Sequence, residues 1–214
     1  MAGADALDRL VRATVGEPVS VAFQGERGAY GHLLVERLWG ANVWVTPCWT
    51  FADVIDAVTC RRSGFAVLPV HNEIIGEIPG VRSAIATAGL TLIAEVRQPI
   101  RHCLLGTPGS TLRDITIVYS HPAALAQCRA FLGRHPAMDF GESYDTAGAA
   151  RDVAARALPN EAAIAGAGCA GRYGLQLLVE DNGDREDNAT IFAVVGQRGP
   201  DDAPSDQGSD DDLG

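Results

Sequence analysis

The sequence contains no lysine, so all 17 of its basic residues are arginines. This absence excludes mechanisms that form a lysine Schiff base, such as those of pyridoxal phosphate enzymes and lysine aldolases, and it excludes the lysine of a Walker phosphate loop. The formal net charge is −10, and the arginines form no basic run. A nucleic acid is therefore not expected as a partner.

Closely spaced cysteines and long apolar runs are also missing. The five cysteines, at positions 48, 60, 103, 128 and 169, never form a Cys-x-x-Cys pair, so neither a zinc knuckle nor a redox motif is predicted. No segment is long and apolar enough for a membrane span, and residues 1–17 lack the apolar region of a signal peptide. Together with the odd number of cysteines, these absences predict a cytoplasmic, reducing compartment and no membrane partner.

The rest of the composition is typical of a globular protein. Apolar residues make up 47% of the 214 residues and charged residues 21%, which is enough for a substantial core. Six aspartates lie between residues 200 and 214, among proline, serine and glycine residues that have little apolar surface to bury. We therefore expect a disordered acidic tail over 199–214 and an N-terminal extension over 1–17.

Short apolar segments alternate with amphipathic segments between these two ends. Strands are predicted at 18–25, 42–47, 65–70, 115–119, 138–140, 161–165, 176–180 and 190–196. Helices are predicted after the first strand, after Thr50 as N-cap, near 79–88, and over 122–134, 146–157 and 166–173. Continuous apolar strands alternating with helices predict mostly parallel sheets that are covered on both faces.

The run 90–106 is too long for one strand and is interrupted at Pro99, so it suits a crossover between two lobes. We expect an α/β fold of two lobes, the first formed by residues 18–98 plus 188–198 and the second by 99–187. Two such lobes imply a cleft between them, where helix N-termini commonly hold small anions.

Six strings lie along the chain in a characteristic order. They are FQGERGAYGH at 23–32, VLPVHNEIIGEI at 67–78, QPIRHCLLG at 98–106, YSHPAALAQCRAFL at 119–132, DTAGAA at 145–150 and DNGDREDNATIF at 181–192. In order and spacing they resemble the prephenate dehydratase family, whose second string reads Val-Pro-Ile-Glu-Asn-Ser-x-x-Gly and whose last ends in Thr-Arg-Phe. The resemblance covers about residues 18–198.

The resemblance implies a two-lobed fold like that of type II periplasmic binding proteins, with prephenate in the interlobe cleft. It implies that Asn72, Ser120, Gln127 and Thr146 bind the substrate and that Thr190 donates to the departing oxygen. Nothing in the sequence requires a metal or an organic cofactor, and the family commonly forms homodimers. Family members usually add a phenylalanine-sensing ACT domain after the last strand; the acidic tail stands there instead, so we expect that feedback control to be absent.

Several positions depart from the family pattern. They are Ala29 and Gly31 in place of hydroxyl residues, His71 for Glu, Glu73 for Ser, Ala123 for Gln, and Ile191 for the Arg between Thr and Phe. An apolar side chain cannot replace the donors of an arginine. We therefore expect the same class of ligand but weaker expulsion of the ring hydroxyl.

A dehydratase expels carbon dioxide and the ring hydroxyl of prephenate together, giving phenylpyruvate. The related prephenate decarboxylases of antibiotic pathways retain the hydroxyl and protonate a ring carbon, giving a dihydro-4-hydroxyphenylpyruvate. A histidine suits that proton transfer, so the altered residues favour a decarboxylase in which His71 and Thr190 are catalytic. On this interpretation, a His71→Glu, Ile191→Arg double variant should gain phenylpyruvate formation.

Two other functions stay open, a plain dehydratase of phenylalanine biosynthesis and a non-catalytic module that binds a small carboxylate. Each candidate residue also has a structural alternative. His71 could be a solvated loop residue, Ser120 and Thr146 could be helix N-caps, Gln127 could be a surface residue of its helix, and Thr190 could serve packing alone. His32 and His102 are as readily structural as functional, and His121, which precedes Pro122, could serve only to orient that turn. The product formed from prephenate separates the two enzymatic functions.

Overall fold

The computed structural model describes residues 7–8, 11–12, 18–40 and 43–197. The tail expected to be disordered therefore lies outside the described residues, as does most of the predicted N-terminal extension. Within the described ranges, no helix combines the length and the apolar character that crossing a membrane would require.

The first of two β-sheets gathers strands from both ends of the chain. Its strands are β1 (Ser20–Gln24), β2 (Trp44–Cys48), β3 (Phe65–Asn72), β4 (Gly76–Glu77), β5 (Thr91–Pro99) and β11 (Ala189–Gly196). They follow the order β2-β1-β3-β11-β5, with β4 paired to β3. Helix α2 (Tyr30–Trp39) packs on one face of this sheet, and α3 (Phe51–Thr59) and α4 (Val81–Thr87) pack on the other.

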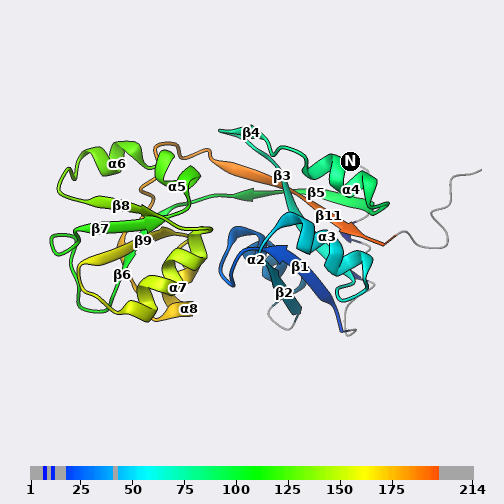
Figure 1. Cartoon of the computed structure of the whole chain (residues 1–214), viewed down its shortest axis with the longest axis horizontal. Helices are drawn as coiled ribbons and strands as arrows, with labels where there is room; N and C mark the ends of the chain where they lie inside the picture. Colours follow the sequence, from blue (N-terminus) through cyan, green and yellow to red (C-terminus); the bar gives the residue numbers. More distant parts are fainter. Residues whose placement is uncertain (1–6, 9–10, 13–17, 41–42, 198–214) are drawn as a thin grey trace, which may run out of the picture.

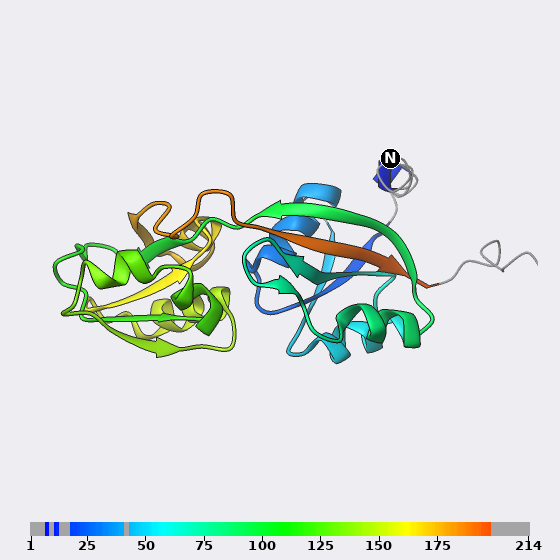
Figure 2. The same ribbon diagram turned by 90° about the horizontal axis from the view of Figure 1, so that it is seen from above.

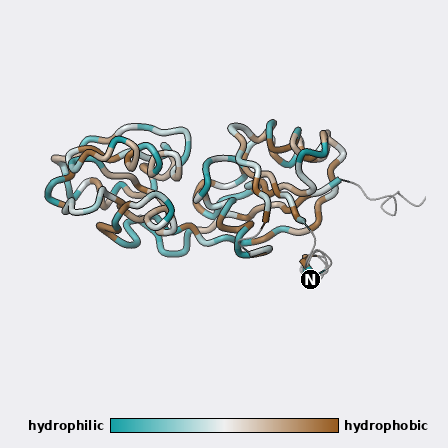
Figure 3. The backbone as a smooth tube through the Cα atoms, turned by 90° about the horizontal axis from the view of Figure 1, so that it is seen from below, coloured by the Kyte–Doolittle hydropathy of each residue, from teal (hydrophilic) through white to brown (hydrophobic). Residues whose placement is uncertain are grey.

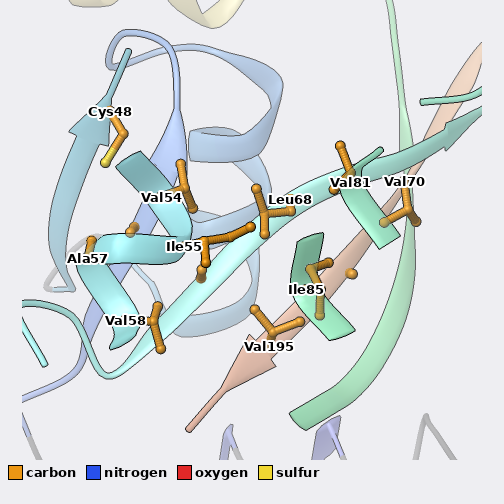
Figure 4. Packing of buried hydrophobic residues seen from close by; sticks show 13 residues of the cluster. Cys48, Val54, Ile55, Ala57, Val58, Leu68, Val70, Val81, Ile85 and Val195 are labelled. Atoms are coloured by element: carbon orange, nitrogen blue, oxygen red, sulfur yellow. The ribbon is translucent and has the colours of Figure 1, made fainter. Parts of the chain in front are cut away.

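Helix α3 shows how the sequence builds this lobe. The Thr50 hydroxyl accepts a hydrogen bond from Asp53 N at 3.1 Å, and the Asp53 carboxylate accepts one from Thr50 N at 3.0 Å, which completes a capping box. The helix then buries apolar residues at a helical spacing against β3, β11 and α4 (Figure 4). The predicted N-cap at Thr50 is confirmed.

The second sheet forms the other lobe, which lies beside the first (Figure 1). Its strands are β6 (Cys103–Gly106), β7 (Ile117–Ser120), β8 (Asp139–Glu142), β9 (Glu161–Ala165) and β10 (Gln176–Val179), in the order β10-β6-β9-β7-β8. Its helices are α5 (Pro122–Ala126), α6 (Arg129–Gly133), α7 (Thr146–Arg156) and α8 (Gly168–Tyr173). In both lobes, hydrophobic and hydrophilic stretches alternate along the chain (Figure 3).

Both sheets are mixed, so the prediction of mostly parallel sheets is wrong. Strand β11 runs antiparallel to β3 and β5, and β6 runs antiparallel to β9 and β10. The reason is that the chain crosses between the lobes twice, once from β5 to β6 and once from β10 to β11 (Figure 2). A strand that arrives from the other lobe enters its sheet against the direction of the strands already there. The α/β class itself is confirmed.

The single helix predicted over 122–134 is two short helices. Cys128 has φ −119° and ψ 23°, which is outside the helical region. The Asp184 carboxylate accepts hydrogen bonds from Arg129 N at 3.1 Å and Ala130 N at 2.9 Å, so it caps the second helix from a distant loop. Gln127 therefore ends α5 as its C-cap instead of lying inside a helix.

Candidate active site

A cavity of about 230 Å³ lies between the two lobes. The first lobe contributes residues from β3, β11 and the start of α2, and the second contributes residues from α5 and from the turn that begins α7. Ile100 and His102, from the crossover between β5 and β6, complete the wall. Most of the wall is apolar, with a few polar groups pointing at one space, which is the usual character of a small-molecule site.

Two helices, α2 and α7, begin at the cavity. Tyr30 and Gly31 open α2, and Thr146 opens α7. The N-cap of α2 is Ala29, whose side chain cannot accept a hydrogen bond, so the first N–H groups of this helix keep no side-chain cap. Among the described residues that line the cavity there is no arginine. An anionic ligand would therefore meet N–H groups, hydroxyls and amides.

Thr190 and Asn72 lie opposite each other on β11 and β3, and both line the cavity. Asn72 Nδ2 donates to Thr190 Oγ1 at 2.9 Å, and it is also within 3.0 Å of Asn188 Oδ1 and the Ala189 carbonyl. Asn72 Oδ1 accepts from the backbone N–H groups of residues 74 and 75 at 3.0 and 3.1 Å. The amide of Asn72 is thus fully occupied within the protein, and the Thr190 oxygen is used as an acceptor.

Gln127 also lines the cavity, and its Oε1 accepts two hydrogen bonds. The donors are Asn188 Nδ2 at 3.0 Å and His102 Nε2 at 2.9 Å. His102 is buried, and burial lowers the pKa of its imidazole, an effect that the hydrogen bond to Gln127 partly opposes. His102 is therefore neutral at pH 7 and is a structural part of the cavity wall.

Of the remaining predicted site residues, Thr146 lines the cavity and Ser120 does not. Thr146 is the first residue of α7, whose N-cap is Asp145, and α5 is capped by the His121 imidazole. Ser120 is fully buried and donates its hydroxyl to the Ile164 carbonyl at 2.6 Å. The proposed capping roles of Ser120 and Thr146 are therefore wrong, because in each turn a neighbouring residue is the cap.

His71 is also absent from the cavity wall. The pairing of β3 with β11 joins His71 to Ile191 and Pro69 to Phe192, so Val70 is an extra residue that forms a bulge. The bulge reverses the alternation of side chains along β3, so that Asn72 faces the cavity and His71 the other side. There His71 Nδ1 lies 3.7 Å from Glu77 Oε2, and Ile191 packs beside the core of α3 and α4.

A set of contacts between the lobes closes one side of the cavity. The Asp145 carboxylate accepts a hydrogen bond from Glu26 N at 2.5 Å, and the Tyr144 hydroxyl donates to Glu26 Oε1 at 2.7 Å. Arg151 forms an ion pair with the Glu26 carboxylate, and the rings of Trp49 and Tyr144 lie 4.5 Å apart. Burial raises the pKa of Asp145 and of Tyr144.

Other cavity residues were not selected from the sequence as site residues. They include Gln24, Tyr30, His102, His121, Tyr144 and Asp145. Among these, only the two histidines stood out in the sequence: His121 precedes Pro122, and His102 lies in the crossover that follows Pro99. Within the described residues, no group of three or more His, Cys, Asp or Glu side chains is arranged to hold a metal ion.

The buried histidines predict a dependence of stability on pH. Burial lowers the pKa of His102 and of His32 below the ordinary value of 6.5. Below pH 6.5 the unfolded chain takes up protons that the folded chain does not, so we expect the free energy of unfolding to fall, by up to about 1.4 kcal/mol per pH unit for each group. Asp145, whose pKa is raised, acts in the opposite direction.

Urea unfolding at pH 7.5 and pH 5.5 measures this change. A His102→Gln variant keeps an N–H donor for Gln127 but cannot titrate, so it should lose less stability than the unaltered chain between the two pH values. Equal losses for the two proteins would contradict the assignment of His102 as a neutral buried group.

The fold and the cavity define a two-lobed α/β protein with a small-molecule site between its lobes. The family model for prephenate dehydratase matches residues 21–200. The chain therefore belongs to the prephenate dehydratase family, which is a family of lyases, and the predicted family is confirmed.

Curated relatives and solved structures agree with this assignment. The chain is 38% identical over 182 residues to a bifunctional N-acyl-homoserine lactone acylase/prephenate dehydratase of Komagataeibacter europaeus, covering 83% of this chain and 63% of that protein. It is 37% identical to arogenate dehydratase 2 of Petunia hybrida, covering 86% and 46%. The structure of prephenate dehydratase from Arthrobacter aurescens, in complex with L-Phe, matches with a TM-score of 0.77 and 31% identity, covering 85% and 61%. The chain thus spans less than two thirds of the length of these relatives.

Proposed function

We propose that the chain is a lyase that converts prephenate to phenylpyruvate. The observation that carries this proposal is the state of Thr190, whose oxygen accepts from Asn72 while its O–H, within the described residues, has no acceptor. That hydrogen is therefore available to a ligand in the cavity. A departing hydroxyl needs such a donor, and donors fixed in advance around developing charge are the strongest single contribution to catalysis.

The proposed reaction breaks two bonds of the substrate. The bond between the ring and its carboxylate breaks, carbon dioxide leaves, and the electron pair moves into the ring. As the pair moves, the bond between the ring and its hydroxyl breaks, and the oxygen leaves as hydroxide, which takes up a proton from solvent to form water. Thr190 donates a hydrogen bond to this oxygen, and the ring becomes aromatic.

The other cavity residues have supporting roles in this proposal. Gln127 and Thr146 bind the substrate, together with the N–H groups that open α2. Asn72 is assigned a different role from the one expected from the sequence, because its amide groups are already bonded within the protein. It orients Thr190 instead of contacting the substrate.

A non-aromatising prephenate decarboxylase is the second candidate, and specific observations favour it. Ala29, Gly31 and Ala123, which replace polar residues of the family, all line the cavity, so the wall offers fewer donors to a departing hydroxyl. His121 also lines the cavity, and since its Nδ1 accepts from Ala123 N at 3.1 Å, the neutral ring carries its proton on Nε2. In this reaction His121, and not His71, would donate a proton to the ring.

Turnover assays with prephenate and with arogenate test the proposed function. We expect loss of prephenate with equal amounts of carbon dioxide and phenylpyruvate, measured against a reaction without protein at the same pH. Binding of prephenate by calorimetry without any turnover would instead support the binding module and would contradict both enzymatic functions.

The double variant His71→Glu, Ile191→Arg is no longer expected to gain phenylpyruvate formation. Because neither side chain lines the cavity, we expect the ratio of aromatic to hydroxylated product to stay the same. The products of both proteins should be compared by chromatography, with Ala123→Gln, a change inside the cavity wall, as the matched variant. A gain of phenylpyruvate in the double variant would show that these two positions act on the reaction.

A further inference from the structure

A continuous network of hydrogen-bonded side chains runs along the cavity wall, and all of its members except Asn188 line the cavity. It runs from Asn72 through Asn188 and Gln127 to His102 and ends at Tyr30. Three of its members, Asn72, Asn188 and Gln127, are amides, and an amide carries a donor on its nitrogen and an acceptor on its oxygen. The direction of every link therefore depends on the direction of its neighbours.

The backbone fixes the direction of the hydrogen bonds at the Asn72 end of this network. The N–H groups of Ile74 and Ile75 can only donate, so the atom of Asn72 that they meet must be its oxygen. The amino group of Asn72 then faces Asn188 and donates to its Oδ1. Asn188 in turn must present its own amino group to Gln127.

The directions of the remaining hydrogen bonds, from Gln127 to Tyr30, are fixed in turn. Gln127 presents Oε1 to Asn188, and this oxygen also faces His102 Nε2, so His102 must carry a proton on Nε2. A neutral ring then has a bare Nδ1, which faces the Tyr30 hydroxyl at 3.2 Å. Tyr30 Oη also donates to the Arg101 carbonyl at 2.7 Å, and one hydroxyl proton can be shared between these two acceptors.

This order of donors and acceptors leaves the amino group of Gln127 available to a ligand. With Oε1 held by two donors, Nε2 is the remaining polar atom of this side chain, and within the described residues it has no hydrogen-bond partner. We propose that His102 and Asn188 are positioning residues that hold the Gln127 amide with its amino group toward the cavity, as a donor to an anionic oxygen of the substrate. This inference rests on the proposed function for the identity of the substrate, but the orientation of the amide does not depend on it.

Two substitutions test this network, one at the Gln127 amino group and one at the donor that orients it. Gln127→Glu keeps an acceptor for Asn188 and His102 but places a carboxylate oxygen where the amino group was. Asn188→Asp keeps the acceptor for Asn72 but removes the donor to Gln127. The Gln127 amide should then flip, so that its amino group faces residue 188 and its oxygen faces the cavity. We expect each variant to lose about 100-fold in kcat/KM for prephenate, with a marked rise in KM.

The tautomer of His102, read by 15N NMR of histidine-labelled protein, separates orientation from activity. We expect the Nε2–H tautomer in the unaltered chain and in Gln127→Glu, and a shift to Nδ1–H in Asn188→Asp. Nδ1–H in the unaltered chain would overturn the inferred direction, as would full activity of Gln127→Glu. If prephenate is not turned over at all, the proposed function fails while the tautomer still decides the inference.

Variants of His102 test its positioning role. Glutamine can place an amide N–H close to the position of His102 Nε2, whereas leucine cannot donate. We expect His102→Gln to keep kcat/KM within about tenfold and His102→Leu to lose about 100-fold. Equal losses in the two variants, measured on folded protein, would contradict a role that depends on the donor.

Discussion

Replacing Thr190 with valine should lower the rate of prephenate consumption by about 100- to 1,000-fold while leaving the protein folded. Valine has nearly the shape of threonine but no hydroxyl, so the donor to the departing oxygen is lost. The fold should tolerate the change, because the Asn72 amino group has two hydrogens and keeps two acceptors, Asn188 Oδ1 and the Ala189 carbonyl. Initial rates at saturating prephenate, with circular dichroism spectra of both proteins, measure this result.

The matched control is Thr190→Ser, which keeps the hydroxyl and removes only a methyl group. It should retain most of the activity. If Thr190→Val turned over prephenate as fast as the unaltered chain, Thr190 would serve packing alone, and the role proposed for it would be wrong.

Replacing Gly25 with alanine should both destabilise the protein and open its cavity. Gly25 has φ +100°, a conformation that other residues adopt only with strain. A Cβ atom at this position would also overlap the Asp145 carboxylate and lie 3.3 Å from the Ala29 side chain. Because Asp145 accepts the hydrogen bond from Glu26 N, the clash would push the two lobes apart where they meet.

We expect Gly25→Ala to lower stability by at least about 2 kcal/mol, or roughly 4–8 °C in Tm for a chain of this size, and to raise KM for prephenate. Gly109→Ala is the matched control, since Gly109 has φ +88° but nothing within 4 Å of its added Cβ. It should lose stability through strain alone and leave KM unchanged. Equal KM values for the two variants would show that the contact between the lobes does not shape the site.

The sequence predicts most elements of the fold, for reasons that are local. Thr50 caps α3 and starts a helix whose apolar residues recur at the right spacing, and the segment 65–70 is an apolar strand at the centre of its sheet. The direction of β11 could not be predicted in this way, because it depends on where the chain returns from the second lobe. Similarly, the break between α5 and α6 depends on Asp184, more than 50 residues further along the chain.

The candidate site was predicted in part. Asn72, Gln127, Thr146 and Thr190 do lie around one cavity. His71 was expected in the cleft because it stands at the position of the family Glu, but the bulge at Val70 turns its side chain away from the cavity, and a bulge depends on how the strand pairs with its neighbour.

The parts of the site that the sequence did not indicate are those that act through other side chains. His102 and Asn188 lie 86 positions apart, and both reach the same oxygen of Gln127. No spacing in the sequence predicts this contact, because the two crossovers between the lobes bring these residues together. A histidine next to a crossover is as readily a structural residue until its partners are known.

The mass of the acid formed from prephenate tests the central claim most directly. The purified chain should be incubated with prephenate at neutral pH, and the product should be identified by mass spectrometry and ultraviolet spectrum beside a reaction without protein. If Thr190 assists expulsion of the ring hydroxyl, the product is phenylpyruvate, which has lost both carbon dioxide and water. A product that has lost carbon dioxide alone and keeps a non-aromatic ring would contradict this account and establish the decarboxylase.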